Sequence, residues 1–150
     1  LYPNLTGIEN LSYFATLAGC PDTTTEYLMD TLSRAGLPED AVGRPVGDYS
    51  KGMRQKVGIA MAMARRAQLL LLDEPTSGLD PKASNEFSQL VSSLRDGGVA
   101  VLMATHDLFR SREIATRIGI MKRGELVAQL DASDVSHTDL ERLYLEHMRD

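Results

Sequence analysis

Cysteine, excess positive charge and long apolar runs are all scarce in this sequence. Cys20 is the only cysteine among 150 residues, which excludes an internal disulfide and a cysteine-ligated zinc cluster. Acidic residues outnumber basic ones by 21 to 16, and a net charge of −5 argues against a general nucleic-acid binder. No run reaches the ~18 apolar residues of a membrane span. We expect one domain in a reducing cytoplasm, with any membrane association made through a partner.

The strongest pattern lies between residues 49 and 80, where an apolar run ends in two acids. The run 69–72 is Leu-Leu-Leu-Leu, and its lack of alternation predicts a strand buried on both faces of a parallel sheet. Asp73 and Glu74 then fall at the carboxyl edge of the sheet, where open α/β sheets bind ligands. Asp73 could hold Mg²⁺, directly or through a water molecule, while Glu74 activates the attacking water. The alternative is that Asp-Glu-Pro merely caps a strand before a turn.

A helix is predicted just before this strand. Ser50 is a suitable N-cap, and Gly52 leaves room around the backbone at the helix start. Free N–H groups and the helix dipole at such a start favour an anion. An ordinary capped helix with an apolar face is the alternative. The apolar positions at helical spacing are Met53, Val57, Ala60, Met61 and Ala64.

The other elements are predicted from caps, turns and periodicity. Asp80 followed by Pro81 starts a helix, and a second apolar strand spans 99–105. Lys122-Arg123-Gly124 joins two strands, 117–121 and 125–130, in a hairpin. Three capping boxes predict further helix starts: Thr6 with Glu9, Thr23 with Glu26, and Thr138 with Glu141.

His106 follows the second apolar strand, so we expect it at the same sheet edge as Asp73 and Glu74. An imidazole there could donate a hydrogen bond to a terminal phosphate and help to fix the water. A satisfied loop side chain is the alternative for a lone histidine. His137 and His147 have no comparable context.

Four segments together resemble motifs of the ATP-binding cassette (ABC) ATPases. They are Tyr49-Ser50-Lys51-Gly52-Met53 for the signature, Leu69 to Glu74 for the Walker B strand, Ser77-Gly78-Leu79-Asp80 for the D-loop, and Ala104-Thr105-His106-Asp107 for the switch-histidine loop. The resemblance implies a P-loop NTPase-like α/β fold with a mainly parallel sheet flanked by helices. A helical subdomain with the signature helix would span about 1–66, and the later part of the catalytic core about 67–150.

The resemblance also implies roles for single residues. Glu74 and His106 would be catalytic, and Asp73 would be the Mg²⁺ ligand. Ser50, Lys51 and Gly52 would contact ATP bound by a second cassette, and Ser77, Gly78 and Asp80 would lie at the interface. The implied function is ATP hydrolysis that drives transport through a separate membrane permease, at the inner face of the cell membrane and without nucleic acid.

Several family features do not occur in these 150 residues. The phosphate-binding motif G-x-x-x-x-G-K-[S/T], the Q-loop glutamine and the adenine-stacking aromatic are missing, so we expect only the later part of the domain here. A helix start contributes about 0.3–1 kcal/mol toward an anion, whereas micromolar ATP binding needs about 8 kcal/mol. This chain alone should therefore bind nucleotide weakly or not at all.

Two substitutions within the signature segment qualify the function. Lys51 replaces a glycine and Met53 a glutamine of the family motif, and the form YSKGM resembles efflux cassettes, which favours export. Two alternatives stay open. One is a soluble ABC ATPase that acts on ribosomes or DNA, and the other is a non-catalytic interaction module.

Overall fold

The computed structural model describes residues 1–148, which divide into two compact units. The first unit is Leu1–Met103 and the second begins at Ala104. The subdomain boundary expected near residue 66 lies inside the first unit and stays a prediction. Within the described residues, every helix is too short or too polar to cross a membrane.

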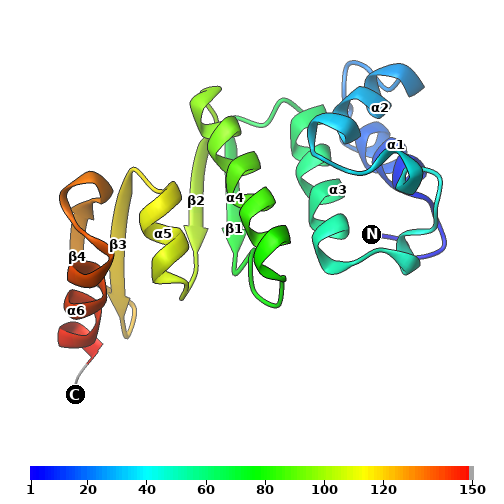
Figure 1. Cartoon of the computed structure of the whole chain (residues 1–150). Helices are drawn as coiled ribbons and strands as arrows, with labels where there is room; N and C mark the ends of the chain where they lie inside the picture. The colour runs from blue at the N-terminus through cyan, green and yellow to red at the C-terminus, as the bar shows by residue number, and fades with distance from the viewer. Residues whose placement is uncertain (149–150) are drawn as a thin grey trace. The chain divides into compact units, whose positions relative to one another are not determined.

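The first part of unit one is a bundle of three helices (Figure 1). The elements are α1 (Gly7–Leu17), α2 (Thr25–Arg34), the 3₁₀ turns η1 (Glu39–Ala41) and η2 (Val46–Asp48), and α3 (Lys51–Ala64). Each α-helix packs on the other two, because each has one apolar face. Leu11, Leu32 and Val57 meet in the core and are fully buried. The apolar face predicted for α3 is confirmed, since Val57, Ala60 and Ala64 are buried and Met53 and Met61 pack against them.

Hydroxyl caps fix where these helices begin. The Thr6 hydroxyl accepts the Glu9 N–H, and the Glu9 carboxylate accepts the Thr6 N–H at 2.8 Å, so this predicted capping box is confirmed. The box predicted at Thr23 is wrong, since Thr24 caps α2. The carboxylate of Asp22 accepts both the N–H (2.9 Å) and the hydroxyl (2.8 Å) of Thr24, which holds this threonine in the capping position.

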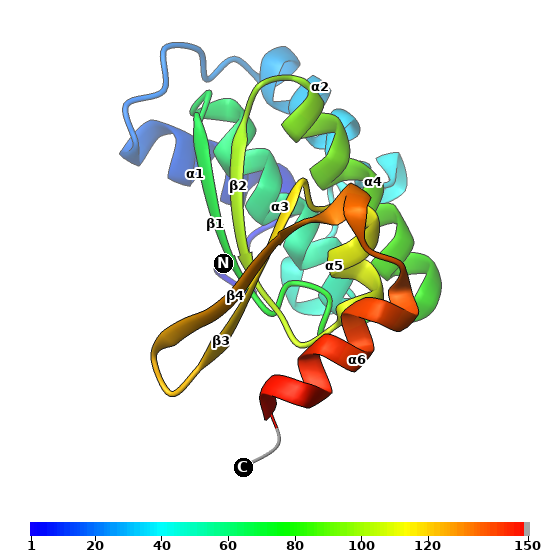
Figure 2. The same cartoon turned by 90° about the vertical axis from the view of Figure 1, so that its left-hand side faces the viewer.

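A two-stranded sheet follows the bundle. It consists of β1 (Leu69–Asp73) and β2 (Ala100–Ala104), joined by α4 (Pro81–Asp96). Figures 1 and 2 show the strands side by side, and Figure 1 draws their arrowheads at the same end, as expected for a parallel pair. The predicted order of strand, helix and strand is confirmed.

The two strands are not buried on both faces, contrary to the prediction. Leu69 is 55% exposed, Leu71 69% and Leu102 66%, whereas Leu70, which points the other way, is 7% exposed. We call Leu69, Leu71 and Leu102 the leucine face. The prediction assumed helices on both sides of the sheet, but the described helices of this unit cover only the side of Leu70.

The second unit pairs a hairpin with two helices. The elements are α5 (Leu108–Ile114), β3 (Arg117–Lys122), β4 (Glu125–Asp131), the 3₁₀ turn η3 (Ala132–Asp134) and α6 (His137–Met148). β3 and β4 are antiparallel, and the turn residues Arg123 (φ 52°) and Gly124 (φ 86°) both have positive φ, as a tight two-residue hairpin requires. The predicted hairpin is confirmed.

The last helix packs on α5 and β3 through the fully buried Leu140. The capping box predicted for it at Thr138 is wrong. The hydroxyl of Ser136 accepts the Asp139 N–H at 3.1 Å, so the helix begins one residue earlier than Thr138. Thr138 then lies inside the first turn, where it cannot act as the cap.

Candidate functional site

The loop after β1 holds the predicted acids. Asp73 is the last residue of β1 and is exposed, while Glu74 is half-buried with a backbone φ of 45°. The Ser77 N–H donates to the Glu74 carbonyl at 3.1 Å, which closes the turn. A side chain larger than hydrogen is disfavoured in this left-handed region, and such outliers cluster at functional sites. The fold therefore holds the Glu74 backbone in a left-handed conformation that glutamate rarely adopts.

The start of α3 fits an anion. Ser50 is the N-cap, and its hydroxyl accepts the Met53 N–H at 3.2 Å, as predicted. Gly52 is buried, and a Cβ built there would lie 3.4 Å from the Cβ of Ala83 in α4. No residue of the first turn of α3, all of it described, is acidic. The N–H groups and the dipole at this end thus favour an anion.

Two side chains of α3 hold the loop after β1. The ammonium group of Lys51 donates to the Ser77 carbonyl, and the amide nitrogen of Gln55 donates to the Pro75 carbonyl. Lys51 also lies over Gly78, where a Cβ would be 3.5 Å from its Nζ. Sequence reasoning missed Gln55. Its spacing of four from Lys51 indicated a shared face, but the partners lie 20 and 26 residues further on.

The start of α4 closes the same loop. Asp80 is the N-cap of α4, its carboxylate accepts the Ala83 N–H at 2.9 Å, and Pro81 is the first helical residue, as predicted. Lys56 of α3 and Glu86 of α4 form an ion pair at 2.6 Å that the sequence did not reveal. The hydrogen bond from Lys56 lowers the pKa of Glu86. α3, the loop and α4 are thus joined by polar contacts at three points.

His106 belongs to the second unit and is exposed, two residues after β2 ends. The Thr105 hydroxyl accepts the Asp107 N–H at 3.1 Å, and Asp107 caps α5, so the backbone on either side of the histidine is fixed. The two units are defined separately. The meeting of His106 with Asp73 and Glu74 therefore stays a prediction.

The acids fit one mode of Mg²⁺ binding. Among the described residues no three His, Cys, Asp or Glu side chains gather as a ready-made metal cage. Asp73 and Glu74 offer adjacent carboxylates, and Mg²⁺ in phosphoryl-transfer sites is usually held by one or two carboxylates together with substrate phosphates and waters. The donor set agrees with that mode.

A strand ending in adjacent acids, beside a helix start free of acidic residues, gives the chain the architecture of part of an α/β nucleotide-binding domain. The solved dimeric structure of the ATP-binding cassette MJ0796 bound to ADP and Pi superposes with a TM-score of 0.76 at 28% identity, covering 88% of this chain and 59% of that one. The sequence profile of the family described as "AAA domain, putative AbiEii toxin, Type IV TA system" matches residues 22–109. The chain belongs to this AAA-domain family, its relatives are ABC transporter ATP-binding proteins, and its solved neighbours are ATP-binding cassettes.

Two relatives illustrate the similarity. The uncharacterized ABC transporter ATP-binding protein YdbJ of Bacillus subtilis (strain 168) is 40% identical over 91% of this chain and 44% of its own length. The fluoroquinolones export ATP-binding protein of Mycobacterium tuberculosis (strain ATCC 25618 / H37Rv) is 38% identical over 85% of this chain and 41% of its own length. The chain thus spans less than half of either relative. The resemblance drawn from the four motifs is confirmed.

Proposed function

We propose that the protein containing this chain hydrolyses ATP to drive export through a separate membrane permease. The observation that carries the proposal is the conformation of Glu74, held at a left-handed φ directly after the exposed Asp73. Relatives named for fluoroquinolone, bacitracin and lantibiotic transport support the direction and class of transport.

The residues divide the chemistry as follows. Asp73 would hold Mg²⁺, which neutralises phosphate charge when bound, and Glu74 accepts a proton from the attacking water. His106 donates a hydrogen bond toward the terminal phosphate. In the proposed pair, Ser50, Lys51 and Gly52 face ATP held by a second cassette, since the N–H groups at the start of α3 favour an anion.

The proposed assembly is a pair of cassettes at the inner face of the membrane. Ser77, Gly78 and Asp80 would lie near the shared interface. The dimeric state of MJ0796 supports a pair, and the structure of CbiO1, described as part of the transporter complex CbiONQ, shows the same fold in a protein from such a complex. Purification with a permease would test the second partner.

Glu74→Gln in the complete ATPase tests the catalytic assignment. Loss of the base should lower kcat about 10²–10⁴-fold, with ATP binding kept, since the amide preserves size and hydrogen-bonding reach. Glu125→Gln, an exposed glutamate of β4, is the matched control and should keep wild-type turnover. Turnover of Glu74→Gln within about tenfold of wild type would remove Glu74 from the role of base.

A further inference from the structure

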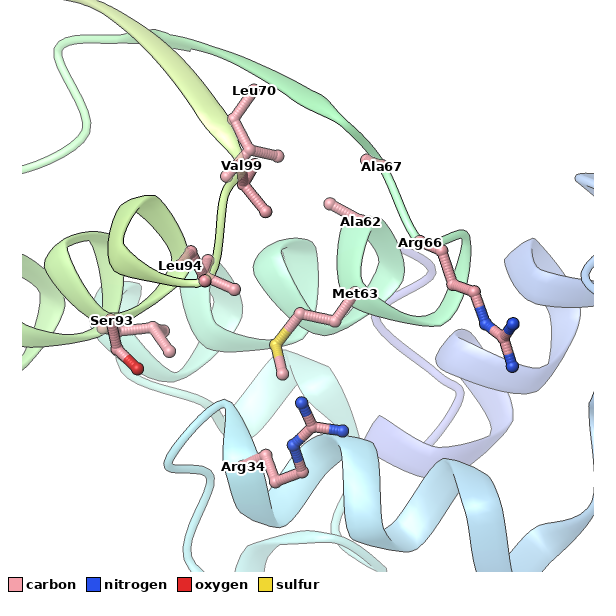
Figure 3. Close-up of a pocket in the computed structure, with 11 residues that line it drawn as sticks. Arg34, Ala62, Met63, Arg66, Ala67, Leu70, Ser93, Leu94 and Val99 are labelled. Atoms are coloured by element: carbon pink, nitrogen blue, oxygen red, sulfur yellow. The ribbon is translucent and has the colours of Figure 1, made fainter.

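A cavity of about 400 Å³ opens in the first unit, away from the acids (Figure 3). Its walls come from the ends of α2, α3 and α4 and from the beginnings of β1 and β2. Asp73 ends β1 and Glu74 follows it, at the other end of the strand from Leu70, so the cavity is separate from the loop that carries these acids. Cavities of this size with apolar walls and a few polar groups are typical of small-molecule sites. The residues that matter are Arg34, Met63, Arg66, Leu70, Leu94 and Val99.

The lining has an apolar side and a cationic side. Figure 3 shows Leu70, Leu94 and Val99 on one side and the guanidinium group of Arg34 on the other, while the Arg66 side chain starts at the rim and extends away from Leu70 and Val99. None of the residues that line the cavity, all within the described part of the chain, is acidic. The lining therefore suits a ligand with an apolar part at one end and an anionic group at the other.

Neither arginine is strongly engaged elsewhere. Arg34 reaches Asp30 at 3.7 Å, but both side chains are more than 60% exposed, and such pairs hold weakly. Arg66 acts on Asp22 only at a distance. Hydrogen bonds from Thr24 are the main reason that the pKa of Asp22 is lowered, and the charge of Arg66 adds a smaller effect. Both guanidinium groups can turn to a ligand.

The backbone gives an independent reason to look at Arg66. Helices α1, α2 and α4 are each followed by a glycine with positive φ, and these are Gly19 (66°), Gly36 (77°) and Gly98 (92°). α3 ends with the hydrogen-bond pattern seen at these helix ends. The Arg66 N–H donates to the Met63 carbonyl at 2.9 Å, and the Ala67 N–H donates to the Ala62 carbonyl at 3.0 Å. Its residue with positive φ is Arg66 (52°). Glycine suits this position best, so the arginine side chain is kept there at a cost in stability.

We propose that this cavity binds a small amphipathic anion. The apolar body lies against Leu70, Leu94 and Val99, and a carboxylate or phosphate group is held by Arg66 with help from Arg34. Guanidinium groups suit this role, because their planar N–H donors match both oxyanions. The site goes beyond ATP hydrolysis and uses none of its residues, so it can stand or fall separately from the proposed function.

Titration calorimetry on the whole 150-residue chain, or on a longer protein that contains it, tests the site. The probes are decanoate, decyl phosphate, decyltrimethylammonium and inorganic phosphate. We expect at least one tailed anion to bind, and the choice between decanoate and decyl phosphate identifies the anionic group. The tailed cation and phosphate alone should bind at least about tenfold more weakly. If decyltrimethylammonium binds as tightly as the tailed anions, the decyl chains simply adsorb to exposed apolar surface. If inorganic phosphate binds as tightly, the apolar wall contributes nothing to binding. Either result overturns the proposal.

Variants at Arg66 separate ligand binding from a structural role. Arg66→Gly should weaken anion binding about tenfold or more and raise the melting temperature, because the backbone strain is relieved while the guanidinium is lost. Arg44→Gln removes an exposed arginine outside the cavity and should leave binding unchanged. If Arg66→Gly binds the tailed anion as well as wild type does, the site as proposed does not exist.

Discussion

At the scale of single residues, Tyr49 shows how the signature helix is anchored. It is 3% exposed, and its hydroxyl donates to the Ala41 carbonyl at 2.6 Å. A Cβ on Gly7 would lie 2.3 Å from that hydroxyl, so a glycine is needed where α1 passes the ring. Burial raises the pKa of Tyr49. The residue before Ser50 is thus a buried anchor that ties the entry of α3 to α1 and η1.

Tyr49→Phe should destabilise the chain by about 1 kcal/mol, because one buried hydrogen bond is lost while the ring stays. The Ala41 carbonyl still accepts the Arg44 N–H, which keeps the cost moderate. Urea unfolding measures the difference. Tyr13→Phe is the control, since Tyr13 is 45% exposed and phenylalanine keeps its ring contacts with Tyr2 and Phe14. A Tyr49→Phe midpoint equal to that of the control would show that the bond contributes nothing.

The sequence predicted a helix N-cap correctly where only one suitable residue preceded the helix, and wrongly where two suitable residues were adjacent. Thr6, Ser50 and Asp80 cap their helices as the sequence indicates, because the cap depends on the next three residues only. Thr23 failed, since the neighbouring Thr24 is held by Asp22. The left-handed φ of Glu74 could not be predicted from the sequence, because glutamate rarely adopts this region and no glycine or asparagine marks the position.

At the scale of elements, an ion pair links α3 to α4. The Lys56 side chain is 14% exposed and the Glu86 side chain 40%, and their charged atoms are 2.6 Å apart. Partial burial of Lys56 places this pair near the upper end of the surface range. A double-mutant cycle with Lys56→Met and Glu86→Gln should give a coupling energy of about 1 kcal/mol.

Lys82→Met supplies the control cycle for this pair. Lys82 lies 3.9 Å from the same Glu86 but is 87% exposed, so its coupling should stay within about 0.3 kcal/mol. Chemical denaturation of the four variants of each cycle gives both numbers. Equal coupling energies for the two lysines would mean that Lys56 does not join the helices.

The start of α1 should respond to acid. Hydrogen bonds from the Thr6 N–H and hydroxyl lower the pKa of Glu9 below its ordinary 4.5. The stabilisation from these bonds is fully present above pH 4.5, the pKa of the Glu9 carboxyl in the unfolded chain. It is lost as the pH falls through the lower pKa that this carboxyl has in the folded chain.

Urea midpoints of wild type and Glu9→Gln should therefore converge as the pH falls from 6 toward 3. The amide keeps an acceptor for Thr6 but does not titrate. Glu39→Gln, an exposed glutamate in η1 that makes no capping bond, should run parallel to wild type. A constant gap between wild type and Glu9→Gln down to pH 3 would contradict the assignment.

At the scale of the whole molecule, the sequence predicted the order of elements but not which surfaces would be covered. Helix and strand periodicities are local, so the strand–helix–strand order and the hairpin were confirmed. The four-leucine run predicted burial on two sides, yet Leu69 and Leu71 are exposed. Burial needs a partner layer, and a run of leucines cannot say whether that layer lies in the same 150 residues. This chain matches only 59% of the length of MJ0796, so the fold of MJ0796 has further elements.

The leucine face should make the isolated chain self-associate, because side chains that gain about 1.5–3 kcal/mol each on burial will meet those of a second copy. Leu71→Lys combined with Leu102→Lys should keep the chain monomeric at concentrations where wild type forms larger species in sedimentation velocity. Leu17→Lys changes a single exposed leucine of α1 and should not have this effect. Monomeric wild type at all concentrations would refute the prediction.

Lys51 and Gln55 contact backbone carbonyls of Ser77 and Pro75, not their side chains. Replacing those two loop residues would therefore leave both bonds in place, whereas a slide or rotation of α3 would displace the peptide units immediately after Glu74. A movement of α3 is therefore coupled to a movement of the loop after β1. A displacement of the start of α3 is therefore transmitted to the peptide units next to Glu74 without passing through the sheet.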